Sequence, residues 1–123
     1  KESPQLNAIA YSRFNTLVEN PEISHYGIGT YNVGEEVLYP AGFTPQNYIT
    51  NVQNTAPLHW QGLVNPMFSY YGYYIGSGPT VGIIGSCPTT EIPGPNINVT
   101  EFFQQQGCQT EMMTSTWLVI DMS

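Results

Sequence analysis

Residues 116–122, Thr-Trp-Leu-Val-Ile-Asp-Met, decide the fold of this chain. Four large apolar side chains follow one another from Trp117 to Ile120, so neither face of an extended segment is left polar. Because the side chains of a strand alternate between two faces, a continuous apolar run is typical of a central strand covered on both sides. The sequence therefore predicts a sheet with residues 116–122 in its interior.

Residues 3–19 supply the predicted partner of that sheet. Ser3 is a favourable N-cap, Pro4 fits the first helical position, and Asn20-Pro21 ends the segment. A stripe at the helical period runs along one face, and Arg13 is its only polar member; the stripe consists of Leu6, Ile9, Ala10, Arg13, Phe14, Leu17 and Val18. A strand over Leu6–Tyr11 is the competing interpretation. We expect a helix.

The middle of the chain contains further sheet candidates separated by glycine and proline. A loop over 21–42 is expected to hold at most a short strand near Val37–Tyr39, and a two-turn helix is expected to begin at Thr44-Pro45. Strands are predicted over Trp60–Asn65, Met67–Ile75 and Thr80–Ile84, with a turn at Gly76-Ser77-Gly78-Pro79. The resulting fold class is α+β: one domain over 1–123, with an N-terminal amphipathic helix packed on an antiparallel β-sheet and a disulfide-closed loop toward the C-terminus.

Charge is scarce in this chain. Charged residues make up 9% of the 123 residues, against roughly 25% in ordinary soluble domains. Lys1 and Arg13 are the only Lys or Arg residues, against nine acidic residues. Nucleic-acid binding and docking on an anionic membrane both require clusters of basic side chains, so we expect no nucleic-acid partner and no membrane contact.

The two cysteines, Cys87 and Cys108, are predicted to form a disulfide. Their spacing fits neither a CxxC redox motif nor a zinc motif. Closing this loop in an oxidising compartment stabilises a fold by about 3 kcal/mol, which together with the low charge predicts an extracellular or cell-surface location. Two buried free thiols are the alternative. Within the loop, Asn98-Val99-Thr100-Glu101 has the form of a capping box before a short helix ending at Gly107, and Asn98 also heads a glycosylation sequon.

Enzyme chemistry finds little support in the sequence. His25 and His59 are the only histidines, and they form no HxxxH, HxH or HExxH spacing for a metal. We interpret both as solvent-facing loop residues, and we expect no metal and no cofactor. Glu35 and Glu36 are adjacent and would point apart on an extended segment, so a glycosidase pair would have to combine distant residues such as Glu91 and Asp121.

The aromatic stretch Trp60–Tyr74 is the best binding candidate. Tyrosine and tryptophan bury a large area at low rotamer cost and keep a polar end, which favours them at carbohydrate and protein contacts. If the stretch is a strand, Phe68 and Tyr70 face one side and Tyr71 and Tyr73 the other. The alternative is that the rings fill the core. The predicted binding residues are Trp60, Tyr70, Tyr71, Tyr73 and Tyr74.

The order of these features resembles the globular domain of type IV pilins, in particular the type IVb and minor-pilin branch. The resemblance rests on the N-terminal helix, the segment Leu38–Phe43, the residues Asn54, Trp60, Gly62 and Val64, and the cysteine-bounded loop. It implies a helix packed on an antiparallel sheet, a pair Cys87–Cys108 that closes the loop, and a loop surface that meets neighbouring subunits. The hydrophobic N-terminal helix of the family does not occur in the sequence, so the resemblance implies a soluble truncation.

We therefore predict a non-enzymatic extracellular structural or adhesive subunit, such as a minor pilin, whose partners are subunits of the same assembly or a surface receptor or glycan. A secreted binding module, lectin-like or inhibitor-like, that uses the aromatic stretch is the first alternative. A small secreted hydrolase is the second.

Overall fold

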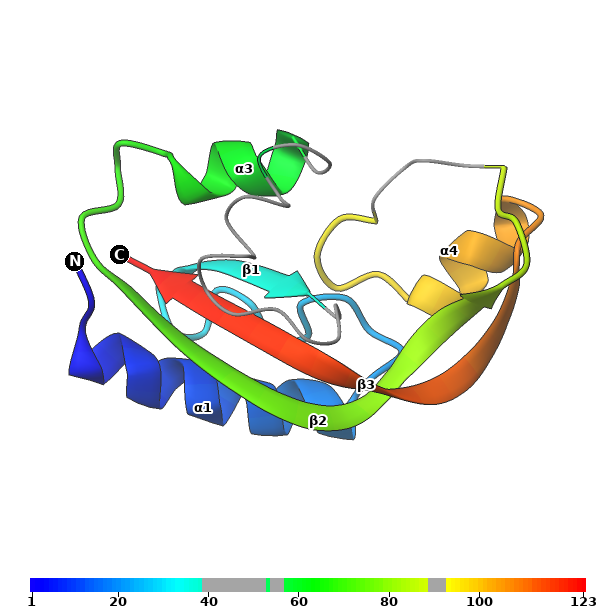
Figure 1. Ribbon diagram of the computed structural model, residues 1–123, viewed down its shortest axis with the longest axis horizontal. Helices are drawn as coiled ribbons and strands as arrows, with labels where there is room; N and C mark the ends of the chain where they lie inside the picture. The colour runs from blue at the N-terminus through cyan, green and yellow to red at the C-terminus, as the bar shows by residue number, and fades with distance from the viewer. Residues whose placement is uncertain (39–52, 54–56, 89–92) are drawn as a thin grey trace.

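The computed structural model of the chain describes residues 1–38, 53, 57–88 and 93–123. A long helix lies along a twisted antiparallel sheet, and two short helices lie elsewhere around it (Figure 1). The α+β class predicted from the sequence is confirmed. The elements, in chain order, are α1 (Pro4–Glu19), β1 (Gly34–Leu38), α3 (Pro57–Leu63), β2 (Tyr71–Ile84), α4 (Val99–Gln105) and β3 (Gln109–Met122).

The central strand of the sheet is β3. The strand order is β1-β3-β2 and both pairings are antiparallel. The run 116–122 therefore has a neighbour on each side, as its composition predicts, and Trp117 to Met122 are all buried. The strand begins earlier than predicted, at Gln109, because β2 continues alongside it to Ile84.

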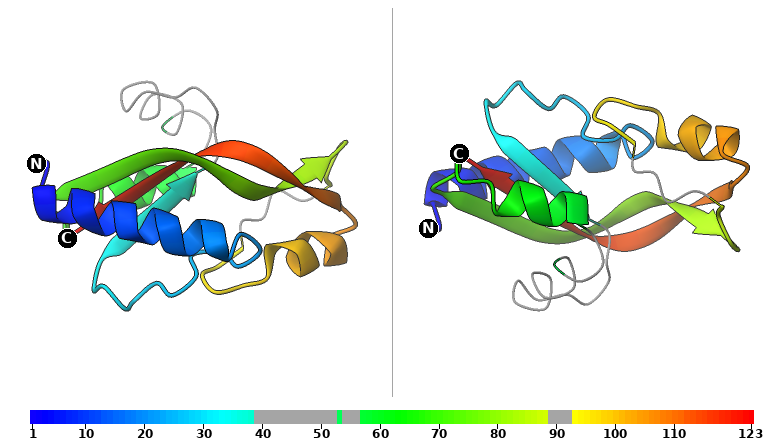
Figure 2. Two further views of the ribbon diagram at one scale, coloured as in Figure 1. Left: turned by 90° about the horizontal axis from the view of Figure 1, so that it is seen from below. Right: turned by 90° about the horizontal axis from the view of Figure 1, so that it is seen from above.

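One face of the sheet packs against α1. Ala10, Phe14 and Leu17 of the helix form a core cluster with Trp117 and Val119 of β3. Ser3 caps the helix, with its hydroxyl accepting a hydrogen bond from the Leu6 N–H, as predicted. Figure 2 shows α1 running along the two long strands. The predicted apolar stripe is the face that the sheet covers, and Arg13 on it is fully buried.

The opposite face of β3 carries a second cluster. Leu118, Ile120 and Met122 are buried there, with Trp60 and Leu63 of α3 partly buried against them. Since consecutive residues of β3 serve two different clusters, the unbroken apolar run has a direct physical reason.

Two predicted elements of the middle region are wrong. Residues 57–63 form the helix α3 where a strand over Trp60–Asn65 was predicted. Gly76–Pro79 is not a turn, because β2 runs through it as one strand. A Cβ atom at Gly76 would lie 2.7 Å from the Phe14 ring. Gly76 is therefore needed for the close approach of the Phe14 ring of α1 to β2, and it does not mark a turn.

Two further expectations concern the region before α3. The short strand expected near Val37–Tyr39 is β1, over Gly34–Leu38. The helix expected from Thr44-Pro45 lies outside the described residues, as does most of the segment Leu38–Phe43.

The disulfide Cys87–Cys108 is present, with its Cα atoms 5.0 Å apart. Cys87 follows the end of β2 and Cys108 directly precedes β3, so the bond joins the two ends of the β2–β3 connection. The predicted capped helix also forms: Asn98 accepts from the Glu101 N–H at 2.9 Å, and Gly107 adopts the positive φ of a helix terminator.

Candidate functional site

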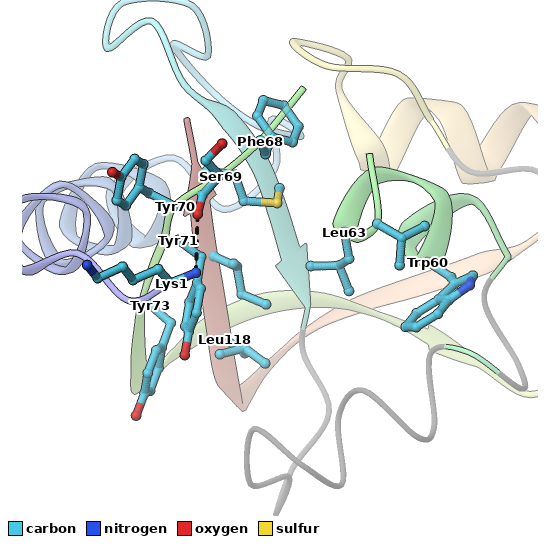
Figure 3. Close-up of a pocket in the computed structure, with 12 residues that line it drawn as sticks. Lys1, Trp60, Leu63, Phe68, Ser69, Tyr70, Tyr71, Tyr73 and Leu118 are labelled. Carbon is cyan, nitrogen blue, oxygen red and sulfur yellow. Dashed lines mark hydrogen bonds between the residues drawn. The ribbon is translucent and has the colours of Figure 1, made fainter. Parts of the chain in front are cut away.

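A cavity of about 390 Å³ opens between α3 and the sheet, on the face opposite α1 (Figure 3). Its size lies within the range of small-molecule and side-chain pockets, about 300–1,000 Å³. Four of the five predicted binding residues line it. The lining consists of Lys1, Trp60, Leu63, Val64, Phe68, Ser69, Tyr70, Tyr71, Tyr73, Leu118, Ile120 and Met122.

The walls of this cavity come from several parts of the chain. Leu118, Ile120 and Met122 of β3 form one wall, and α3 brings Trp60 and Leu63 to another. The remaining wall is supplied by the segment 68–70, by Tyr71 and Tyr73 at the start of β2, and by Lys1.

That third wall is held by backbone hydrogen bonds at the end of β3. The Ser69 and Tyr70 N–H groups donate to the Ser123 carbonyl at 2.8 and 3.0 Å, and the Ser123 N–H donates back to the Tyr70 carbonyl at 3.1 Å. The main-chain nitrogen of Lys1 donates to the Ser69 carbonyl at 3.2 Å. The shape of the cavity therefore depends on Ser123, directly after β3, as well as on α3.

The chemical character of the lining is apolar and aromatic. Phenol hydroxyls and the Ser69 hydroxyl supply its neutral polar groups, and no carboxylate or amide side chain occurs among the lining residues. Tyr70 and Tyr71 are 48% and 40% exposed, so the tyrosines at the edge remain open to solvent. Such a surface accepts an apolar group and can hydrogen-bond to it only at the edge.

Tyr71 and Tyr73 share one side, as the predicted alternation requires, but Phe68 and Tyr70 line the same cavity and do not face the other side. The reason is that β2 begins only at Tyr71, so the residues before it do not follow the strand period. Tyr74 is the predicted binding residue that lies elsewhere. It packs against Tyr11 and Phe14 of α1, each with a centroid separation of 4.9 Å, so it belongs to the core on the α1 face.

A buried charge cluster lies on the α1 face, beside the core. Arg13 of α1 donates to both carboxylate oxygens of Glu35, at 2.7 and 2.8 Å, and to the Tyr26 carbonyl at 2.6 Å. Glu35 of β1 is the register partner of Asp121 of β3. Arg13 and Asp121 are 0% exposed, as is the Glu35 side chain.

The two carboxyl groups of this cluster have opposite pKa shifts. Burial raises the pKa of Asp121 to about 9, reinforced by the Glu35 carboxylate, which can accept the Asp121 proton and whose negative charge disfavours a second one. Burial also acts to raise the pKa of Glu35, but hydrogen bonds with Arg13, His25 and Asp121 outweigh it and lower that pKa to about 2. At neutral pH the pair therefore carries one proton, on Asp121.

Sequence reasoning missed this cluster, although two signals for it were present. Arg13 lies on an apolar helix stripe, and a buried guanidinium needs a buried acceptor to offset the cost of leaving water. Asp121 interrupts an otherwise apolar buried strand. The pairing of Glu91 with Asp121 that a glycosidase would need is not tested by the structure, since Glu91 lies outside the described residues.

Neither histidine side chain faces solvent as the sequence indicated, although His25 does lie in the loop between α1 and β1. His25 Nδ1 lies 3.5 Å from Glu35 Oε1, and its side chain is 22% exposed. His59 is part of α3 and contacts Glu36 of β1, with its side chain 18% exposed. Glu35 and Glu36 point to opposite faces of the sheet, as expected for neighbours on a strand. Each histidine is thus held beside a carboxylate, one on each face.

Asn98, the candidate glycosylation residue, uses its side-chain oxygen to cap α4 and is partly exposed. Among the side chains in the described ranges, no group of three or more His, Cys, Asp or Glu residues is arranged to hold a metal ion. No helix within those ranges is long and apolar enough to cross a membrane.

The chain matches no protein-family model, and neither the curated proteins nor the solved structures contain a match to it. The resemblance to type IV pilins therefore stays a prediction.

Proposed function

We propose that this protein is a non-enzymatic extracellular binding subunit whose α3-face cavity receives an apolar side chain of a partner protein. The observation that carries the proposal is the cavity of about 390 Å³, which is lined by Trp60 on one side and by Tyr70, Tyr71 and Tyr73 on another (Figure 3). Aromatic and aliphatic anchors in a pocket are the usual energetic centre of a protein interface.

The lining favours a protein partner over a glycan. Sugar hydroxyls need polar partners such as carboxylates and amides. Besides its apolar surface, the described lining offers hydroxyls, backbone groups, the Trp60 indole N–H and the Lys1 amino groups, but no carboxylate or amide side chain. An aliphatic or aromatic side chain instead gains about 25 cal/mol for each Å² of apolar surface that it buries. The extracellular location is supported by the Cys87–Cys108 disulfide and by the low charge of the chain.

The experiment is a peptide and glycan array followed by titration of the strongest peptide, with tryptophan emission as the signal. Trp60 lines the cavity whereas Trp117 is buried under α1, so the emission change should disappear in Trp60→Phe. Tyr71→Ala should weaken binding at least tenfold, equivalent to about 1.4 kcal/mol. Tyr11→Ala is the matched control, because Tyr11 is 51% exposed but lies on α1. Equal effects of the two tyrosine variants, or hits among glycans alone, would refute the proposal.

A subunit of a surface filament, such as a minor pilin, is the second candidate function. Its support is α1 packed on an antiparallel sheet together with a disulfide that closes the connection before the last strand. The gene sequence upstream of Lys1 is the test. A hydrophobic segment behind a prepilin cleavage site supports the pilin, and an ordinary signal peptide ending at Lys1 contradicts it.

The hydrolase alternative receives less support than binding. His25 and His59 contact different glutamates on opposite faces of the sheet, so they do not combine into one site. Alanine replacement of the histidines and carboxylates would favour a hydrolase only if a turnover of polysaccharide or peptide were found first and then lost.

A further inference from the structure

The buried cluster of Arg13, Glu35 and Asp121 holds two carboxyl groups and one guanidinium in a place that water does not reach. All three side chains are 0% or 1% exposed. The Arg13 guanidinium donates its hydrogen bonds to the Glu35 carboxylate and to the Tyr26 carbonyl. Neither oxygen of Asp121 has a hydrogen-bond donor among the described residues. A second buried negative charge without a donor is strongly unfavourable, so this geometry requires a proton on the carboxyl pair.

We propose that this cluster is a proton-operated latch: one proton held between Glu35 and Asp121 keeps α1, β1 and β3 joined, and its loss releases the joint. Each carboxyl comes from a different strand and the guanidinium comes from the helix, so the three groups connect three elements. With the proton present, Asp121 donates to Glu35, and Arg13 balances the remaining negative charge. Without the proton, two buried carboxylates face one cation.

Among the described residues, Glu35 and Arg13 are the charged groups that act on Asp121. From α1 it faces Arg13, and from β1 it faces Glu35. From β2 its register partner is Gly72, which has no side chain. His25 contacts Glu35, and the Tyr31 ring lies 5.7 Å from the Arg13 guanidinium carbon. The cluster therefore titrates as a unit in which Asp121 is the group that changes charge.

The latch also adjoins the cavity through the backbone of β3. Asp121 lies between Ile120 and Met122, which line the cavity on the other face. Ser123, two residues on, forms the hydrogen bonds that hold Ser69 and Tyr70 in place. Loosening this end of β3 removes support from the cavity wall. The cavity is therefore best formed under mildly acidic conditions and is progressively less well supported as the pH rises.

The direction of the pH dependence follows from the two shifts. The lowered pKa of Glu35 means that stability is gained as the pH rises from about 2 to 4.5, because the unfolded chain holds more protons there. The raised pKa of Asp121 means that stability is fully present below 3.8 and is lost as the pH rises toward about 9, because the folded chain holds the extra proton. Stability due to the cluster is therefore greatest near pH 4–5.

The test is urea unfolding of the whole chain between pH 5 and 8.5. The unfolding equilibrium constant of the wild type should increase by up to about tenfold per pH unit, the slope for one extra proton in the folded state. Asp121→Asn keeps a donor toward Glu35 and cannot ionise, so its profile should lose that slope. Glu111→Gln is the matched control, since Glu111 is an exposed carboxylate on the same strand. It should follow the wild type.

Two wild-type measurements keep the proposal open to refutation if Asp121→Asn does not fold. Folding at pH 7 in unbuffered solution should take up about one proton, and amide exchange at Ser69 and Tyr70 should lose protection faster with pH than exchange at Val119. A flat wild-type profile, no proton uptake, or an Asp121→Asn variant with the wild-type slope would each overturn the latch.

Discussion

The close contact between α1 and β2 depends on Gly72, so Gly72→Ala directly tests how α1 packs on the sheet. A Cβ atom built at this position lies 2.1 Å from the backbone nitrogen of Asn7 and 2.1 Å from the carbonyl carbon of Leu6. Ordinary van der Waals contact begins at 3.4 Å, so the helix has to move by about 1 Å. Backbone atoms cannot rotate away as the end of a side chain can.

The expected cost follows from what that movement disturbs. Overpacking a filled contact costs about 1–3 kcal/mol. The shift also threatens the hydrogen bond from the Tyr73 N–H to Asn7 Oδ1, 2.9 Å long and worth about 1 kcal/mol. Replacing glycine in a strand returns roughly 0.5–1 kcal/mol, because the unfolded chain has less freedom. The sum predicts that Gly72→Ala lowers the free energy of unfolding by about 1–3.5 kcal/mol.

The assay is urea unfolding at one pH, followed by tryptophan emission. Gly94→Ala is the matched control, because an added Cβ there meets nothing within 4 Å, and it should change stability by less than about 0.5 kcal/mol. Gly76→Ala should fall between the two, since its Cβ meets the rings of Phe14 and Tyr74, which can tilt. If Gly72→Ala proves as stable as Gly94→Ala, the close seating of α1 on β2 is wrong.

Two further predictions concern the disulfide and the tyrosines. Replacing Cys87 and Cys108 by serine should lower the free energy of unfolding by about 3 kcal/mol, because the unfolded chain is no longer closed into a loop with a sequence separation of 21. Mass spectrometry with and without reductant should first show that both thiols are blocked in the native protein. Two freely alkylated thiols would contradict the predicted extracellular location. Tyr71→Ala should change stability by at most about 1 kcal/mol, because Tyr71 is 40% exposed. Tyr73→Ala should cost more, because Tyr73 packs on the cluster of Leu118, Ile120 and Met122. Equal losses of stability in the two variants, measured by thermal unfolding, would contradict this difference.

Periodicity in the sequence predicted the two elements that form the centre of the fold. The stripe on α1 and the apolar run of β3 are long, and each is buried against the other, so local pattern and tertiary packing agree. Ser3 and Asn98 act as caps, as their positions predicted, because a cap depends only on the next few residues.

The errors arose where tertiary contact overrides local preference. The helix α3 is short, and its Trp60 and Leu63 pack on the second core cluster, which the sequence of residues 57–63 alone does not reveal. Glycines of β2 resembled a turn, yet they serve the approach of a helix that lies far earlier in the chain. The charge cluster brings together Arg13, Glu35 and Asp121 from three separate elements. The local patterns around Arg13 and Asp121 indicate that each is buried, but they do not show that the two residues meet.

The position of β2 at the edge of the sheet has a consequence for aggregation. Its fourteen residues contain no charged side chain, and an uncharged edge strand is a template for pairing with other chains. The start of α1 covers one end of the edge: Tyr71 exchanges hydrogen bonds with Lys1 and Ser3, and Tyr73 donates to Asn7. The backbone N–H groups of Tyr71 and Tyr73 point toward the open edge of the sheet, and position 79 points the same way because it lies an even number of residues further along the strand. Since proline has no N–H, Pro79 removes one hydrogen-bond donor from that edge. Damage that lifts the first turn of α1 would therefore uncover an adhesive strand, and its visible result would be fibrous or amorphous precipitate as well as lower stability.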